Sequence, residues 1–424
     1  MSCGENCVIL WLMNSTEQEY YYATLSGGMR VVMHLRPDSV AEHCGVAVHA
    51  GSRDESPEHY GLAHFVEHTI FKGTLRRRSW HILNRMERVG GELTAYTTKE
   101  ETVVYTTYPA GYAERAIDLL ADLVQYSQFP TVEIDRERQV VADEIDSYLD
   151  IPSEGIFDDF DEIMFAGTPL AHPILGSRDS IERLTTDVCR HYLDVYYRPD
   201  NMVLFYSGPE KPERVIRMAE RCFTKRASNT VNKVTIPSPL PVPDNLKDEV
   251  REIGSHQAHT LLGARIHDMY SPDRYATALL TNILGGPGMN SLLNVALRER
   301  RGLVYTVDAS TSLLSDAGLF TIYFGCDRED VERCSRIAGN ILARQASELM
   351  TQRRLDEARR QYLGQLALAS TNTEQRALNM GRSTLLRGRA ITSAEHLEAI
   401  RAVTPADLRR AAESIPALTR LTLL

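Results

Sequence analysis

The chain has 424 residues, of which 43% are hydrophobic and 25% are charged, and its net charge is −10. This length predicts two or three domains, each large enough to bury a core without disulfides. The composition excludes a disordered chain, a collagen-like chain and a small disulfide scaffold. Because the chain is acidic and has no long Lys/Arg run, we expect neither nucleic acid nor an anionic membrane as a partner.

The seven cysteines are odd in number and lack a zinc-ribbon spacing. They predict free thiols in a reducing compartment, and hence a cytoplasmic protein. No window reaches about 18 consecutive apolar residues, so we expect no transmembrane helix. The apolar run 8–13 has no basic segment before it and no small-residue cleavage site after it. We therefore interpret it as a strand or an irregular start rather than a signal peptide.

The N-terminal half reads as strands mixed with pairs of helices. Runs rich in Val, Tyr and Thr predict strands, and apolar residues at helical spacing predict helices. In chain order, we predict strands at 29–35 and 44–50, helices over about 60–73 and 80–89, two strands within 93–108, and helices over about 111–127 and 131–150.

The middle of the chain contains a proline-rich segment, with four prolines in residues 236–243. Such a run is typical of an extended linker. We therefore predict an N-terminal domain at 15–230, a linker at 231–248 and a C-terminal domain at 249–424.

The C-terminal half repeats the order of the N-terminal half. Strand-like runs at 303–307 and 318–324 precede helices around 330–333 and 354–359. This order suggests a diverged repeat, although any two α+β domains could share it. The predicted fold class is α+β.

The strongest chemical signal is the segment Gly61 to His68, which contains His64, Glu67 and His68. On a helix, His64 and His68 share one face at positions i and i+4, so both imidazoles can bind one ion. A catalytic zinc takes three protein ligands and one water, and a nearby carboxylate such as Glu67 can accept a proton from that water. This is the inverted form of the zincin motif. The alternative is two ordinary surface or core-edge histidines.

The third ligand is predicted on the helix at 132–149. Its apolar stripe consists of Ile134, Val141, Ile145 and Tyr148. Glu137 and Glu144 fall in the same stripe, where a carboxylate is costly unless a cation neutralises it. From spacing alone, that cation could be a metal ion or an arginine. The isolated histidines, His172 among them, lack partners at ligand spacing and are predicted to be surface or strand residues.

With these motifs the sequence resembles the M16 zinc metallopeptidases, and among them the shorter chains similar to the mitochondrial processing peptidase. The segments that carry the resemblance cover essentially the whole chain and include Gly51–Glu55, Phe71–Thr74, Gly90–Gly91, Ala95–Thr97 and Pro169–Gly176. Glu144 follows His68 by 76 residues, the family's ligand distance, and Glu137 matches a supporting acidic residue. The resemblance implies zinc held by His64, His68 and Glu144.

A glycine-rich segment, Gly285–Ser291, precedes the second family element. The segment lacks the Gly-Lys-Ser/Thr ending of a phosphate loop. Arg298 and Tyr305, seven residues apart, match a family Arg and Tyr that act from the second domain. A cation and a phenol hydroxyl suit a developing oxyanion. The alternative is a surface arginine and a strand-core tyrosine.

The resemblance implies a zinc endopeptidase built of two homologous halves, each of duplicated sheet-plus-helix layers, that form a clamshell. Peptides or unfolded segments would bind in its chamber as an added β-strand along Thr94, Ala95 and Tyr96. Thr94 departs from the asparagine often found in the family, which affects substrate contacts rather than the metal ligands. A homodimer is expected. The alternative function is a catalytically inactive scaffold or partner subunit of a peptidase complex.

Overall fold

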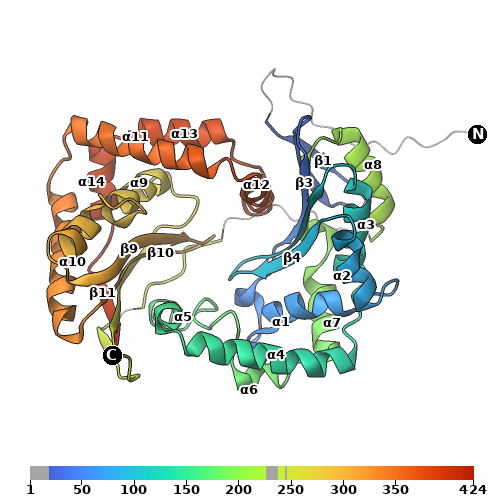
Figure 1. The fold of residues 1–424 in the computed structure, drawn as a ribbon, viewed down its shortest axis with the longest axis horizontal. Coiled ribbons are helices and arrows are strands. Elements are labelled where there is room, and N and C mark those ends of the chain that lie inside the picture. Colours follow the sequence, from blue (N-terminus) through green and yellow to red (C-terminus); the bar gives the residue numbers. More distant parts are fainter. Residues whose placement is uncertain (1–18, 226–236, 244–245) are drawn as a thin grey trace, which may run out of the picture. The chain divides into compact units, whose positions relative to one another are not determined.

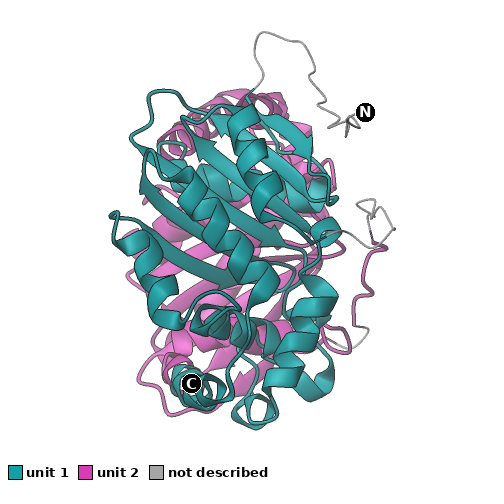
Figure 2. Cartoon of the chain, turned by 90° about the vertical axis from the view of Figure 1, so that its right-hand side faces the viewer, with its two compact units in different colours: residues 1–145, 172–235, 370–392 teal, residues 146–171, 236–369, 393–424 magenta. Residues whose placement is uncertain are grey.

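The computed structural model describes residues 19–225, 237–243 and 246–424. The apolar run 8–13 and part of the predicted linker lie outside these ranges. The chain forms two compact units, coloured separately in Figure 2. Unit 1 contains residues 1–145, 172–235 and 370–392, and unit 2 contains residues 146–171, 236–369 and 393–424. Both units are discontinuous, because each half of the chain contributes one segment to the unit formed mainly by the other half.

Unit 1 is built on a six-stranded sheet in the order β1-β2-β6-β3-β5-β4. Its strands are β1 (Tyr21–Thr24), β2 (Arg30–Leu35), β3 (Ala41–Val48), β4 (Glu92–Thr97), β5 (Thr102–Pro109) and β6 (Met202–Gly208). Strands β2 and β6 are parallel, and the other pairs are antiparallel. β3 and β6 are buried along nearly their whole length, as expected for central strands covered on both faces.

The helices that pack on the sheet of unit 1 are α1 (Leu62–Thr69), α2 (Ser79–Glu87), α3 (Ala113–Tyr126), α8 (Pro212–Cys222) and α12 (Thr373–Arg387). The others in this part of the chain are α4 (Thr131–Leu149), α6 (Arg178–Ile181) and α7 (Thr186–Tyr196). α12 comes from the C-terminal half and packs on β3 and β6 (Figure 1). A Cβ at Gly381 of α12 would lie 2.5 Å from the Phe205 ring, so only glycine permits this close approach.

Unit 2 has a five-stranded sheet in the order β7-β11-β8-β10-β9. Its strands are β7 (Glu249–Arg251), β8 (Ala258–Ile266), β9 (Val304–Leu313), β10 (Gly318–Cys326) and β11 (Thr419–Leu423). Its helices are α5 (Pro152–Met164), α9 (Arg274–Gly285), α10 (Val331–Ser347), α11 (Gln352–Ala369), α13 (Ser393–Ala402) and α14 (Pro405–Glu413). α5 comes from the N-terminal half, and its Ile156, Phe160 and Met164 are buried in a cluster with residues of β8, β10 and β11.

The structure confirms the predicted α+β class, with two mixed sheets and helices packed on them. The predicted helices at 80–89, 111–127 and 131–150 end within about two residues of α2, α3 and α4. The predicted helix at 60–73 is shorter, since regular α-helix ends at Thr69 and a 3₁₀ turn, Ile70–Lys72, follows. Within the described residues, every helix is too short or too polar to cross a membrane.

Candidate metal centre

A buried carboxylate fixes the start of α1. The two oxygens of Glu55 accept hydrogen bonds from the backbone N–H groups of Gly61 (2.8 Å) and Ala63 (2.6 Å). These are among the N–H groups that a helix leaves without a partner at its first turn. Gly61 has φ of +91°, in the left-handed region that glycine adopts without strain. The chain therefore enters α1 at a defined angle, which sets the direction of the histidines that follow.

His172 supports this cap, and the prediction that it is a surface or strand residue is wrong. Its side chain is buried and stacks on the Tyr60 ring, with ring centroids 3.7 Å apart. Its Nε2 lies 2.9 Å from the carbonyl oxygen of Ser52 and 3.2 Å from Oε2 of Glu55. Burial raises the pKa of Glu55, while the bonds from His172 and the backbone of Ala63 and Gly61 favour its charged form.

The predicted ligands His64, His68 and Glu144 converge. Oε2 of Glu144 lies 3.7 Å from Nε2 of His64 and 3.3 Å from Nε2 of His68. One ligand atom from each of these three residues lies within 4.8 Å of the others. The two rings have centroids 4.6 Å apart, as their positions one helical turn apart predict.

This donor set fits a zinc ion. Zinc takes imidazole nitrogen and carboxylate oxygen at about 2.0–2.1 Å, so the edges of its tetrahedron are about 3.3–3.4 Å long. The distances from Glu144 to the two imidazoles are close to that length. Burial, and then the neighbouring His68, lower the pKa of His64 to about 3. His64 is therefore neutral at ordinary pH, which is the form that binds a metal.

Glu137 and Glu144 differ in burial, which corrects the prediction that both lie in the apolar stripe of α4. Glu137 is buried, whereas the Glu144 side chain is 44% exposed. Neither carboxylate has an arginine partner among the described residues. Glu137 instead binds Lys72 Nζ at 2.6 Å and His68 Nδ1 at 3.4 Å. Burial disfavours its charge, but these two bonds lower its pKa.

The bond to Glu137 orients His68. Because Nδ1 donates to Glu137, the other nitrogen, Nε2, is left free to face Glu144. Burial opposes protonation of His68, yet Glu137, Glu144 and Glu67 together raise its pKa. The three carboxylates therefore create a negative electrostatic potential at His68, which favours a bound cation there.

Glu67 lies on the same helix face and is not one of the three clustered residues. Its Oε2 accepts a hydrogen bond of 2.6 Å from Oγ1 of Thr97, at the end of β4. Burial raises the pKa of Glu67, while Thr97 and His68 oppose that rise. A carboxylate with a raised pKa, held in place by one hydroxyl, suits a proton acceptor.

The predicted substrate-binding residues Thr94, Ala95 and Tyr96 lie on β4, the edge strand of the sheet of unit 1. β4 pairs with β5 on one side, and no described strand pairs with its other side. Edge strands present unpaired backbone groups to which an extended peptide can add. The hydroxyl of Thr97 connects this strand directly to Glu67.

Arg298 and Tyr305 belong to unit 2. Arg298 lies in a π-helical turn, Asn294–Glu299, and its side chain is exposed. Tyr305 lies on β9, an edge strand, and is 57% exposed, so it is not a core residue. Its hydroxyl donates to Asp327 at 3.1 Å, and this bond raises its pKa. π-helical turns are rare and are frequent at functional sites.

Comparison with known proteins identifies the family. The profile described as insulinase (peptidase family M16) matches residues 30–178, and that of the peptidase M16 inactive domain matches residues 183–362. The chain belongs to the M16 peptidase family. The first match contains the whole His64, His68 and Glu144 cluster.

Bacterial relatives cover nearly all of this M16 chain. An uncharacterized zinc protease of Streptomyces coelicolor is 32% identical, over 92% of this chain and 86% of its own length. An uncharacterized zinc protease of Bacillus subtilis is 31% identical, over 90% of this chain and 91% of its own length.

Two crystal structures share the fold of this M16 chain. A protease from Helicobacter pylori has a TM-score of 0.86 at 20% identity, covering 95% of this chain and 99% of that one. A Pseudomonas fluorescens structure described as a peptidase M16 inactive domain has a TM-score of 0.85 at 18% identity, covering 96% and 98%.

Sequence reasoning missed four residues that support the metal centre. They are Glu55, Lys72, Thr97 and His172. All four lie within segments on which the family resemblance rests, but the resemblance assigned them no role. The contact of His172 with Glu55 joins residues 117 positions apart, so local spacing gives no sign of it.

Proposed function

We propose that this chain is a zinc-dependent endopeptidase that cleaves peptides or unfolded segments. One observation carries the proposal: two imidazoles and a carboxylate converge beside Glu67, which in turn touches the free edge strand β4. These residues would place a metal ion, a proton acceptor and an extended peptide next to one another within unit 1. The names of the zinc protease relatives support the same assignment.

His64, His68 and Glu144 would hold the zinc ion. When bound, zinc polarises a carbonyl and makes water acidic enough to attack at neutral pH. Glu67 accepts the proton of the attacking water as the water oxygen bonds to the carbonyl carbon, which gives a tetrahedral intermediate. It then passes this proton to the nitrogen of the leaving amine as the C–N bond breaks. Thr97 holds the Glu67 carboxylate in position through these transfers.

The substrate would add to β4 as a further strand. Backbone hydrogen bonds to Thr94, Ala95 and Tyr96 would fix its register. Because these bonds need an extended backbone, folded proteins would be poor substrates and unstructured peptides good ones.

Arg298 and Tyr305 would stabilise the oxyanion of the tetrahedral intermediate. We expect Tyr305→Phe to lower kcat about tenfold or more with little change in KM, because the hydroxyl would act mainly in the transition state. The exposed position of Tyr305 means that the substitution leaves stability unchanged. Steady-state kinetics on a fluorogenic peptide test this. An unchanged kcat would remove Tyr305 from the proposed site.

The central experiment compares wild type with Glu67→Gln on an unstructured peptide. Wild type should cleave it, lose activity with a chelator and regain activity with added zinc. Glu67→Gln should bind zinc in a 1:1 ratio and lose cleavage, because the amide cannot accept the proton. Cleavage that is insensitive to chelator contradicts the proposal. Stoichiometric zinc without cleavage by wild type would favour the alternative of an inactive scaffold subunit.

We also propose a homodimer as the working form, on the family resemblance. Sedimentation velocity of the purified chain tests this, with a single species of about twice the 47.7 kDa chain mass as the expected result. A monomer that is active at all concentrations would contradict it.

A further inference from the structure

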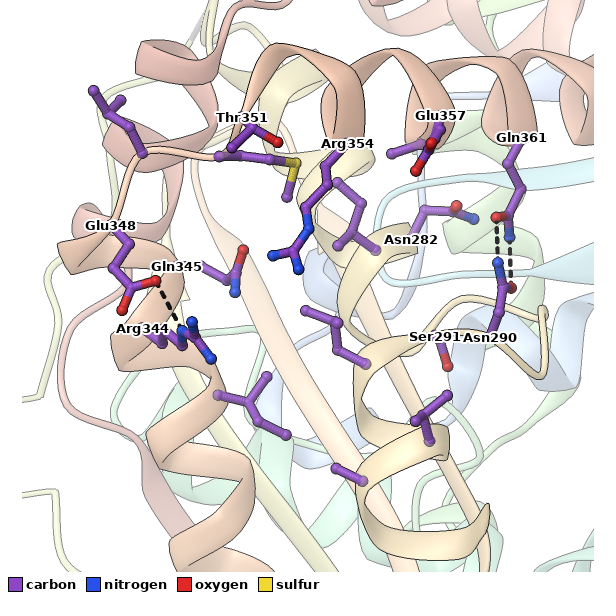
Figure 3. Close-up of a pocket in the computed structure, with 18 of the residues that line it drawn as sticks. Asn282, Asn290, Ser291, Arg344, Gln345, Glu348, Thr351, Arg354, Glu357 and Gln361 are labelled. Atoms are coloured by element: carbon purple, nitrogen blue, oxygen red, sulfur yellow. Dashed lines mark hydrogen bonds and ion pairs between the residues drawn. The ribbon is translucent and has the colours of Figure 1, made fainter. Parts of the chain in front are cut away.

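Unit 2 contains a cavity of about 640 Å³ that no step of the proposed peptidase uses. It lies between the C-terminal end of α9, the segment 290–300, α10 and α11 (Figure 3). Protein pockets that bind small organic molecules commonly have this volume.

Arg354 of α11 places a guanidinium in this cavity. Figure 3 shows its side chain extending from α11 into the space between two bonded pairs of side chains. These pairs are Arg344 with Glu348 (2.8 Å) and Asn290 with Gln361 (2.8 Å). Among the described residues, Arg354 has neither an ion pair nor a hydrogen bond. Its charge is therefore available to a ligand.

Other charges around the cavity are largely neutralised. Glu348 pairs with Arg344, and Glu357 pairs with Arg353, which does not line the cavity. The remaining cation on the wall is Arg300. The unpaired charge is thus positive, while the two carboxylates disfavour a dianion.

Ser291 supplies a second polar group without a partner in this cavity. Ser291 is 5% exposed and lines the cavity, and its Oγ has no hydrogen-bond partner among the described residues. A buried hydroxyl without a partner costs free energy, so an acceptor or donor on a ligand would satisfy it.

The rest of the wall is mostly apolar. Its apolar members are Ile283, Leu292, Val295, Ala296, Ile341, Leu349, Met350 and Ala358. These apolar side chains, beside the unpaired guanidiniums of Arg354 and Arg300 and one free hydroxyl, suit a molecule with an apolar body and a single negative charge.

We propose that this cavity binds an apolar monocarboxylate through Arg354 and Ser291. Two sources share this chemistry, a fatty acid of medium length and the C-terminal residue of a short apolar peptide. The cavity wall from Asn290 to Arg300 contains the π-helical turn of Arg298, so a bound carboxylate would contact the segment that positions this residue.

Isothermal titration calorimetry of the full chain tests the proposal. The titrants are octanoate and N-acetyl-leucyl-leucine, each compared with its neutral amide. The protein is kept in chelator, so that peptide cleavage cannot contribute and the result is independent of the proposed zinc site. We expect saturable binding of at least one carboxylate, and at least about tenfold weaker binding of its amide. The titrant that binds more tightly identifies the source.

Matched variants assign the binding to the cavity. Arg354→Gln should weaken carboxylate binding at least about tenfold, whereas Arg360→Gln, at an exposed position of α11 that does not line the cavity, should not change it. Ser291→Ala should weaken binding a few-fold. Three results would overturn the proposal: no saturable binding of either carboxylate, equal binding of acid and amide, or equal effects of Arg354→Gln and Arg360→Gln.

Discussion

The Glu137 carboxylate binds both the Lys72 ammonium and the imidazole of His68, one of the proposed zinc ligands. Groups that hold a ligating histidine in this way typically affect metal affinity 10–100-fold. We therefore expect Glu137→Gln to weaken zinc binding about 10–100-fold. Competition with a chromogenic chelator measures this.

Glu133 provides the matched control for Glu137. It lies one turn earlier on α4 and pairs with Arg136, away from the histidines. Glu133→Gln should leave zinc affinity unchanged. Equal zinc affinities for both variants would mean that Glu137 does not orient His68.

Thr97 donates the hydrogen bond of 2.6 Å that fixes Glu67. Thr97→Val keeps the shape but removes this donor, so we expect kcat to fall about tenfold while zinc affinity stays unchanged. Thr97→Ser retains the hydroxyl and should restore most of the rate. If Thr97→Ser is as slow as Thr97→Val, the hydroxyl is not the cause.

Spacing in the sequence predicted where some of the site residues lie and which groups they face, but not others. The i, i+4 positions of His64 and His68 follow from helix geometry, and the structure shows them on one face. The stripe of α4 correctly predicted a buried, charge-paired Glu137. It did not predict Lys72 as the partner, because that contact joins residues 65 positions apart, nor the exposure of Glu144 at the edge of the stripe.

Helix α1 depends on Glu55, since a carboxylate from a preceding loop caps its first turn. Glu55→Gln replaces one acceptor oxygen by a donor that faces a backbone N–H. We expect this variant to lower the free energy of unfolding by about 1–3 kcal/mol. Urea denaturation measures it.

Glu58 is the control for this cap, because it lies exposed in the same loop. Glu58→Gln should change the free energy of unfolding by less than about 0.5 kcal/mol. A Glu55→Gln variant as stable as Glu58→Gln would contradict the capping role.

Contact between β5 and α12 should depend on pH. Glu101, next to β5, is buried and pairs with Arg382 of α12. Burial raises its pKa to about 7, against an opposing effect of Arg382. The folded state therefore holds a proton that the unfolded chain releases at lower pH, so this contribution to stability is lost as pH rises through about 7.

Glu101→Gln tests this sign, because glutamine resembles the protonated acid. Relative to wild type, the variant should be more stable at pH 8 than at pH 5. Urea midpoints of both proteins at the two pH values measure the difference. A stability difference that stays constant or falls with pH would contradict the raised pKa of Glu101.

Elements with a clear period were predictable, and irregular ones were not. The amphipathic helices α3 and α4 and the strand β10 follow from their apolar patterns. The π-helical turn at Asn294–Glu299 has no such pattern, since a single inserted residue in a helix leaves little trace in sequence.

On the scale of the whole molecule, two segments join the unit formed mainly by the other half of the chain. Residues 146–171 belong to unit 2 and residues 370–392 to unit 1. Both segments bring an amphipathic helix, α5 or α12, to a sheet face that would otherwise expose apolar side chains. Sequence patterns show that these helices have apolar faces but not which sheet covers them, because any apolar face can pack on any other.

The most direct test of the account is the position of zinc itself. A crystal of the zinc-loaded full chain, measured at the zinc absorption edge, should give one strong anomalous peak in unit 1. That peak should lie within bonding distance of Nε2 of His64, Nε2 of His68 and a carboxylate oxygen of Glu144, with Glu67 outside the bonded shell. A peak elsewhere, or a shell of four protein ligands that includes Glu67, would contradict the proposed metal centre.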